Sequence, residues 1–149
     1  HFPVQEAVCI EGDFRMIDML RGPIAREVGF DSLADDRVKL LSVAPELALM
    51  ASDNSFDVIL SSPSPSSLVA GGASFTREFY QRASGRLASR GIFCQRFECL
   101  DYGPQPLRLI VQAMRQAFRE VIAVKAGPGE MLLMATNSES VFIPDDLPS

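Results

Sequence analysis

Short apolar runs alternate with amphipathic stretches along this chain. The apolar runs have the length and composition of strands, and they cover residues 6–10, 38–43, 56–61, 92–97, 121–125 and 131–135. Apolar positions three or four residues apart predict helices over residues 14–21, 24–28, 45–50 and 74–87, and from Pro104 or Pro106 to about Phe118. Strands separated by helices predict an α/β fold with a mostly parallel sheet.

Capping and turn residues support these boundaries. Asp13 is placed to cap the helix that follows it, and Pro45 suits the first turn of the next. Ala126-Gly127-Pro128-Gly129 joins the last two strands, and a linker of this length predicts an antiparallel hairpin. The run at residues 56–61 is apolar almost throughout, so we expect a strand buried on both faces.

Length and composition narrow the class of protein. The 149 residues suffice for one domain, which we assign to residues 1–137, followed by a polar tail over residues 138–149. A net charge of −5 argues against a nucleic-acid partner. No apolar run approaches the about 20 residues that cross a bilayer, so we expect no membrane contact from this segment.

The cysteine content indicates the redox compartment, and the N-terminal residues bear on whether the chain was processed. Three cysteines without regular spacing argue against a disulfide framework, and a single His is too few for a typical zinc site. A reducing cytoplasm fits this composition best. The chain does not begin with Met and has no secretory signal, so we expect a processed, engineered or partial sequence.

A stretch rich in Ser, Pro and Gly follows the strand at residues 56–61. The carboxyl end of a buried parallel strand is where α/β folds place ligands. Its serines do not indicate a nucleophile, because there is no Gly-x-Ser-x-Gly elbow and the lone His1 is terminal. Beyond it, we interpret Phe75, Phe79 and Tyr80 as core residues, and Arg77 and Glu78 as an ion pair or cap.

The segment from residue 56 to residue 95 resembles the spermidine synthase family, most nearly a bacterial branch in which this domain follows a membrane-embedded region. The specific block is Phe75-Thr76-Arg77-Glu78-Phe79-Tyr80, with Gly91-Ile92-Phe93-Cys94-Gln95 beyond it. Weaker matches extend over about residues 3 to 136. The resemblance implies a Rossmann-like class I methyltransferase fold, cytoplasmic, with an S-adenosyl-type nucleotide as the only cofactor indicated.

The family begins with a strand and a Gly-rich turn that cradles the S-adenosyl ligand, and this chain starts after both. In the family sheet that strand lies between the strands that here contain Cys9 and Ile59. We therefore expect these two strands to pair directly, to pair with another chain, or to leave edges that need covering. Unpaired edges favour self-association.

Three positions match the nucleotide-binding edge of the family. Glu11 matches an acid that binds ribose hydroxyls, although an exposed acid ending a strand is the simpler interpretation. Ala44 stands where relatives carry an Asp that accepts from the adenine amino group, and a methyl group accepts nothing. Ser61 matches the strand-ending serine of the branch.

The catalytic positions are altered. Ser62 stands where relatives carry an Asp or Glu that activates the attacking amine, and a serine is a poor base. Asp101 remains and could bind an amine, although a solvated loop acid is the simpler interpretation. Arg96 replaces a Trp beside the pocket, and its charge would repel a polyamine.

These losses favour a catalytically degenerate domain that keeps the fold for binding or assembly. The alternative is an active transferase that moves an aminopropyl or methyl group from an S-adenosyl-type donor. That alternative needs a Gly-rich donor loop outside this chain and a different base.

Overall fold

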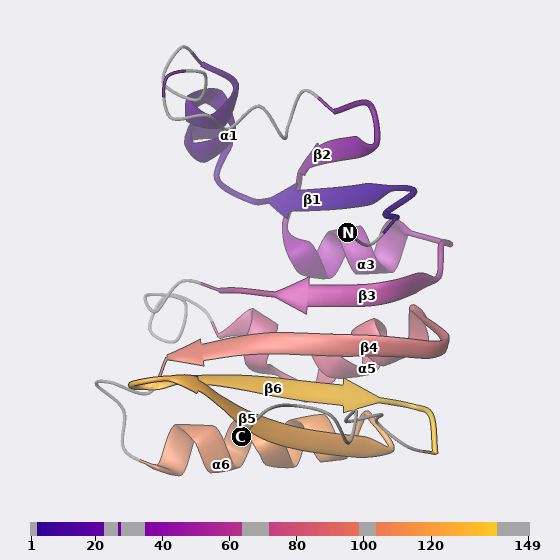
Figure 1. Ribbon diagram of the computed structural model, residues 1–149, viewed down its shortest axis with the longest axis vertical. Coiled ribbons are helices and arrows are strands. Elements are labelled where there is room, and N and C mark those ends of the chain that lie inside the picture. Colours follow the sequence, from indigo (N-terminus) through magenta and orange to yellow (C-terminus); the bar gives the residue numbers. More distant parts are fainter. Residues whose placement is uncertain (1–2, 23–26, 28–34, 64–71, 99–103, 140–149) are drawn as a thin grey trace. The chain divides into compact units, whose positions relative to one another are not determined.

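The computed structural model describes residues 3–22, 27, 35–63, 72–98 and 104–139 (Figure 1). The chain divides into two compact units, His1–Ser52 and Asp53–Ser149, and each is described by itself. Most of the predicted helix over residues 24–28, and the apolar residues 141–143 of the tail, lie outside the described residues.

The first unit is a parallel strand pair with two helices. Its elements are β1 (Ala7–Glu11), α1 (Phe14–Arg21), β2 (Val38–Ser42) and α3 (Pro45–Ala51). β1 and β2 pair in parallel from Ala7↔Val38 to Glu11↔Ser42, so their carboxyl ends lie at one edge. Asp13 caps α1 by accepting the backbone N–H of Arg15 at 2.9 Å, as predicted.

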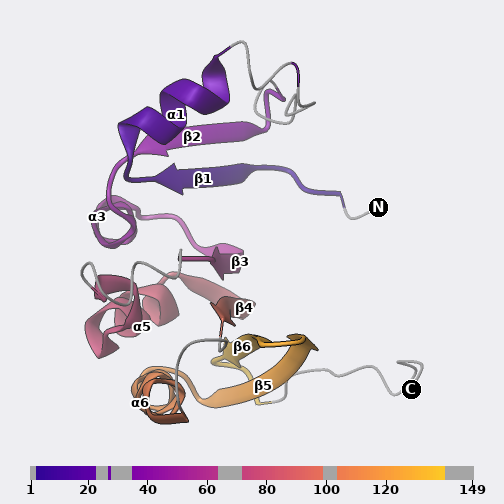
Figure 2. The same cartoon turned by 90° about the vertical axis from the view of Figure 1, so that its left-hand side faces the viewer.

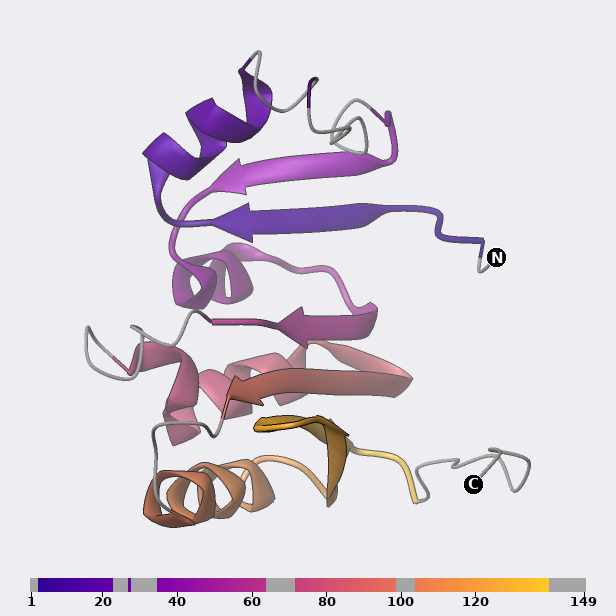
Figure 3. The same cartoon turned by 60° about the vertical axis from the view of Figure 1, so that its left-hand side comes forward.

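The second unit is a four-stranded sheet with its helices on one side. Its elements are β3 (Phe56–Ser61), the short 3₁₀ helix η2 (Ala73–Phe75), α5 (Arg77–Gly85), β4 (Leu87–Glu98), α6 (Pro104–Arg115), β5 (Glu120–Gly127) and β6 (Glu130–Thr136). The strand order is β3-β4-β6-β5; β3 runs parallel to β4, and β6 is antiparallel to both its neighbours. Figures 2 and 3 show α5 and α6 against the same face of these strands. The predicted C-terminal hairpin is confirmed.

An aromatic cluster between the helices and the sheet forms the core of the second unit. Phe93 stacks on Phe118 with ring centroids 5.2 Å apart. Phe79 and Tyr80 from α5 meet Phe93 edge-on at 6.2 and 5.8 Å. All four side chains are buried, so the prediction that Phe79 and Tyr80 belong to the core is confirmed.

The helix predicted over residues 74–87 is shorter than expected. Thr76 caps α5 by accepting the N–H of Phe79 at 3.2 Å, and the helix ends at Gly85. Leu87 lies in β4 opposite Phe56, and β4 therefore begins before the strand predicted over residues 92–97. The prediction was wrong because pairing with β3, which is remote in sequence, extends the strand back to Leu87.

The prediction that β3 is buried on both faces is also wrong. Val58 and Leu60 are 63% and 68% exposed, while Ile59, which points to the other face, is half-buried. Val58 and Leu60 pair with Ile92 and Cys94 of β4, whose side chains alternate with the buried Phe93. They therefore lie on the sheet face opposite α5 and α6.

β1 and β3 are the strands that would flank the expected first strand, and each keeps one unpaired edge within the described residues. Within the described residues, β1 pairs with β2 alone and β3 pairs with β4 alone. The described pairings do not include one between β1 and β3, and the other two outcomes stay predictions. Such edges expose backbone N–H and C=O groups that can pair with a further strand.

Gly91→Ala tests the close approach of β3 and β4. A Cβ at Gly91 would lie 2.8 Å from the carbonyl oxygen of Phe56 and 3.0 Å from the amide nitrogen of Ala88. Both are backbone atoms, so we expect a loss of about 1–3 kcal/mol in the free energy of unfolding, measured by urea titration.

Gly85→Ala is the matched control. Nothing lies within 4 Å of a Cβ at this position, which is the last residue of α5. Alanine should leave stability unchanged or raise it by up to about 1 kcal/mol. Equal effects of the two substitutions would contradict the packing described for Gly91.

Candidate functional site

In the first unit, two of the predicted nucleotide-binding positions lie close together. Glu11 ends β1 and Ala44 follows β2, so both lie at the carboxyl edge of the parallel pair. Between them, a Cβ built on Gly12 would lie 3.9 Å from the Cα of Ala44. The unit therefore brings the Glu11–Gly12 turn against the backbone at Ala44.

The side chains at this edge offer limited chemistry. One carboxylate oxygen of Glu11 accepts the backbone N–H of Asp13 at 2.8 Å, which fixes the direction of the side chain. The N–H of Arg15 lowers the pKa of Asp13, so that cap stays charged at neutral pH. Ala44 caps α3 without any side-chain hydrogen bond. Of the two predicted nucleotide-binding positions at this edge, Glu11 supplies an acceptor for ribose hydroxyls, and the side chain of Ala44 supplies none.

In the second unit, Ser61 and Ser62 lie at the carboxyl end of β3. Ser61 is half-buried and pairs in register with Gln95 of β4. The side-chain amide of Gln95 donates to the hydroxyl oxygen of Ser61 at 3.5 Å. Ser62 is exposed, and Asp101 lies outside the described residues. Each unit thus holds two of the predicted positions.

A charged cluster lies near the end of β4. Arg96 forms ion pairs with Glu98 of the same strand, at 3.0 Å, and with Glu130 at the start of β6. Glu130 raises the pKa of the Arg96 guanidinium by stabilising its charged form. One cation and two carboxylates leave the cluster with a net charge of −1. The guanidinium of Arg96 is therefore not an isolated charge, and its repulsion of a polyamine stays a prediction.

Sequence reasoning missed the partners of Arg96 and the role of Gln95. Glu98 and Glu130 are ordinary surface acids in the sequence, and only the β4–β6 register places them opposite each other. Gln95 was noted as part of a motif, but a polar residue inside an apolar run is itself a signal of a buried hydrogen-bonded group.

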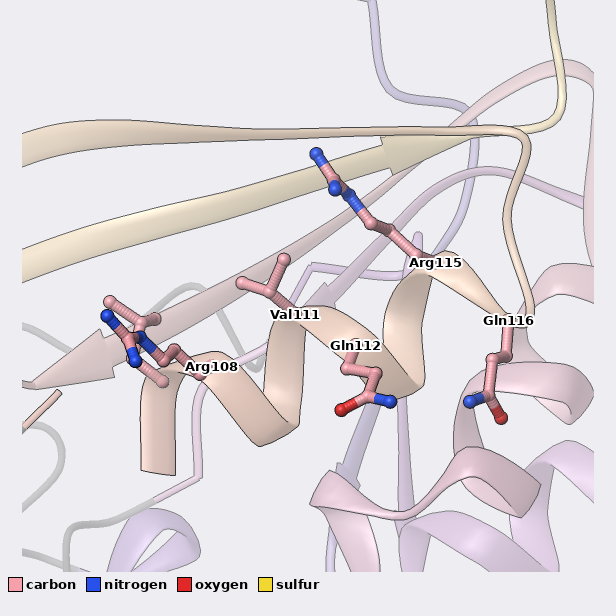
Figure 4. Close-up of a pocket in the computed structure, with 6 residues that line it drawn as sticks. Arg108, Val111, Gln112, Arg115 and Gln116 are labelled. Carbon is pink, nitrogen blue, oxygen red and sulfur yellow. The ribbon is translucent and has the colours of Figure 1, made fainter. Parts of the chain in front are cut away.

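The other surface features of the described residues contain none of the predicted site residues. A hollow of about 480 Å³ runs along α6 and is lined by Leu107, Arg108, Val111, Gln112, Arg115 and Gln116 (Figure 4). None of these was predicted to act in the site. Among the described residues, no group of three or more His, Cys, Asp or Glu side chains is placed to hold a metal ion.

None of the helices in the described ranges combines the length and the apolar character needed to cross a bilayer.

Comparison with solved structures shows the fold. A spermidine synthase in complex with the transition-state analogue AdoDATO matches 94% of this chain with a TM-score of 0.75 and 23% identity. Spermidine synthase from Thermotoga maritima matches 94% of the chain, with a TM-score of 0.74 and 23% identity. Human methyltransferase-like protein 13 in complex with SAH matches 97%, with a TM-score of 0.72 and 17% identity.

These matches place the chain within a class I methyltransferase fold. The chain spans about half of the two synthases, 49% and 48% of their lengths, and 67% of the human protein. No curated protein sequence matched the chain. The model of the spermine/spermidine synthase domain matches residues 1–136. This chain therefore belongs to the spermine/spermidine synthase domain family.

Proposed function

We propose that this chain is a catalytically degenerate spermidine-synthase-like domain that retains its fold for binding or assembly. The observation that carries the proposal is the ion-paired cluster of Arg96, Glu98 and Glu130. An aminopropyl acceptor is a cationic amine, and a site that takes it needs carboxylates free to receive its charge. Here the guanidinium of Arg96 already occupies both carboxylates.

The position of the catalytic acid supports the same proposal. A carboxylate activates the attacking amine by accepting its proton, and such a general base works best when its pKa lies near the operating pH. The hydroxyl of Ser62 is not basic enough for this. Ala44 likewise offers no acceptor to an adenine amino group.

Glu11 favours the alternative of a working transferase. It ends a parallel strand, and one of its oxygens accepts the N–H of Asp13, while the other can accept from a ligand hydroxyl. A carboxylate at this place suits a ribose diol. In this alternative, the Gly-rich donor loop lies outside this chain, and a different base takes the place of Ser62.

Calorimetric titration separates these two functions. We expect no binding tighter than about 1 mM when the chain is titrated with S-adenosylmethionine, its decarboxylated form or methylthioadenosine, because the adenine contact at Ala44 is lost. The measurement is the heat of injection at 25 °C.

Two glutamate substitutions test whether any binding in that titration depends on Glu11. Glu11→Ala removes the ribose acceptor, whereas Glu6→Ala removes an exposed acid paired with Lys39 at 2.6 Å. Submillimolar binding that is lost in Glu11→Ala and kept in Glu6→Ala would overturn the degenerate function and favour the transferase.

Arg96→Gln tests whether the ion-paired arginine excludes amines. The substitution changes the cluster from −1 to −2, so we expect weak binding of putrescine that is absent in the unaltered chain and falls as salt is raised to about 0.15 M. Isothermal titration at low and physiological salt measures it.

Arg119→Gln makes the same change of charge at an exposed arginine paired with Glu139 at 3.2 Å. It should gain no putrescine binding. Binding by the unaltered chain that disappears in Arg96→Gln would contradict the proposed role of Arg96.

A further inference from the structure

Gln95 is a polar side chain buried in the second unit. It is 0% exposed and lies in β4 between the buried residues Phe93 and Phe97, on the face that carries α5 and α6. Its amide reaches three other elements: Tyr80 in α5, Ser61 in β3 and Ser74 in η2. A buried amide retains this place only because its hydrogen bonds are made.

The orientation of the amide follows from its partners. The backbone carbonyl oxygen of Ser74 can only accept, so the nitrogen of Gln95 faces it, at 3.2 Å. The side-chain oxygen of Gln95 then faces Tyr80, whose hydroxyl donates to it at 2.5 Å. Burial raises the pKa of Tyr80 well above its ordinary value, so this hydroxyl remains a donor throughout the physiological range.

The same nitrogen connects the end of β3 to η2. It donates to the hydroxyl oxygen of Ser61, at 3.5 Å, as well as to Ser74. Ser61 is half-buried and is the last residue of β3. Since α/β folds bind ligands beyond the carboxyl ends of parallel strands, Ser61 is among the first polar groups that a ligand would meet at this strand.

We propose that Tyr80 and Gln95 are positioning residues that fix Ser61, at the carboxyl end of β3, relative to Ser74 at the start of η2. Tyr80 acts through Gln95: it holds the amide oxygen, so that the amide nitrogen is presented to both serines. This arrangement holds whether the edge serves catalysis or binding alone, and it is therefore independent of the proposed function.

Tyr80 also packs in the aromatic cluster, so the test has to separate positioning from packing. Tyr80→Phe keeps the ring and its contacts with Phe93 and Phe118, and removes only the hydroxyl. Gln95→Met keeps the approximate volume and removes both N–H donors. Either variant breaks the proposed connection with little change in apolar packing.

Nuclear magnetic resonance of the ¹⁵N-labelled chain gives the readout. In Tyr80→Phe, we expect the side-chain amide protons of Gln95 to exchange with solvent about fivefold faster or more, and the backbone amide resonances of Ser61 and Ser74 to shift. In Gln95→Met, the same two backbone resonances should shift, which keeps the test decisive if one variant folds poorly.

Ser84→Ala is the matched control on the same helix. The hydroxyl of Ser84 donates to the carbonyl of Ala117 at 2.8 Å, so its loss removes one hydrogen bond of α5 away from β3. Ser84→Ala should shift the backbone amide resonances near Ala117 and leave those of Ser61 and Ser74 unchanged. The proposal is overturned if Tyr80→Phe leaves both serines unshifted, or if Ser84→Ala moves them equally.

Discussion

The buried amide of Gln95 is the constraint on which the second unit depends. An amide in an apolar core is tolerated only when its carbonyl and both N–H groups find partners, because water is excluded there. The partners come from β3, η2 and α5, so these elements have to meet β4 at this one place. The aromatic rings of Phe79, Tyr80 and Phe93 pack against one another and supply apolar burial in the same core.

The charged cluster near the end of β4 differs from the buried amide of Gln95 because it lies at the surface. Arg96, Glu98 and Glu130 are partly exposed, so their ion pairs contribute little to stability. Their consequence is for recognition, because a bound guanidinium competes with any incoming amine for the same carboxylates. We propose that this competition limits which amines the end of β4 can accept.

The two faces of β3 differ in how far the helices cover them. Val58 and Leu60 lie on one face and Ile59 and Ser61 on the other, and α5 and α6 cover only the second of these faces. Val58 and Leu60 remain exposed on the other, and one edge of the strand has no ladder partner within the described residues. An apolar face of this kind is suited to association, which fits a binding or assembly role.

Local signals in the sequence determined most of the elements and the family. Asp13, Pro45, Pro104 and the Gly-containing hairpin each act on the backbone within a few residues, so helix starts and the last turn were predicted correctly. Tertiary structure alone decided that Leu87 joins a strand, that Val58 and Leu60 stay exposed, and that Gln95 and Arg96 find their partners. The physical reason is distance along the chain: Arg96 and Glu130 are 34 residues apart, and no local pattern encodes which side chains a sheet register brings together.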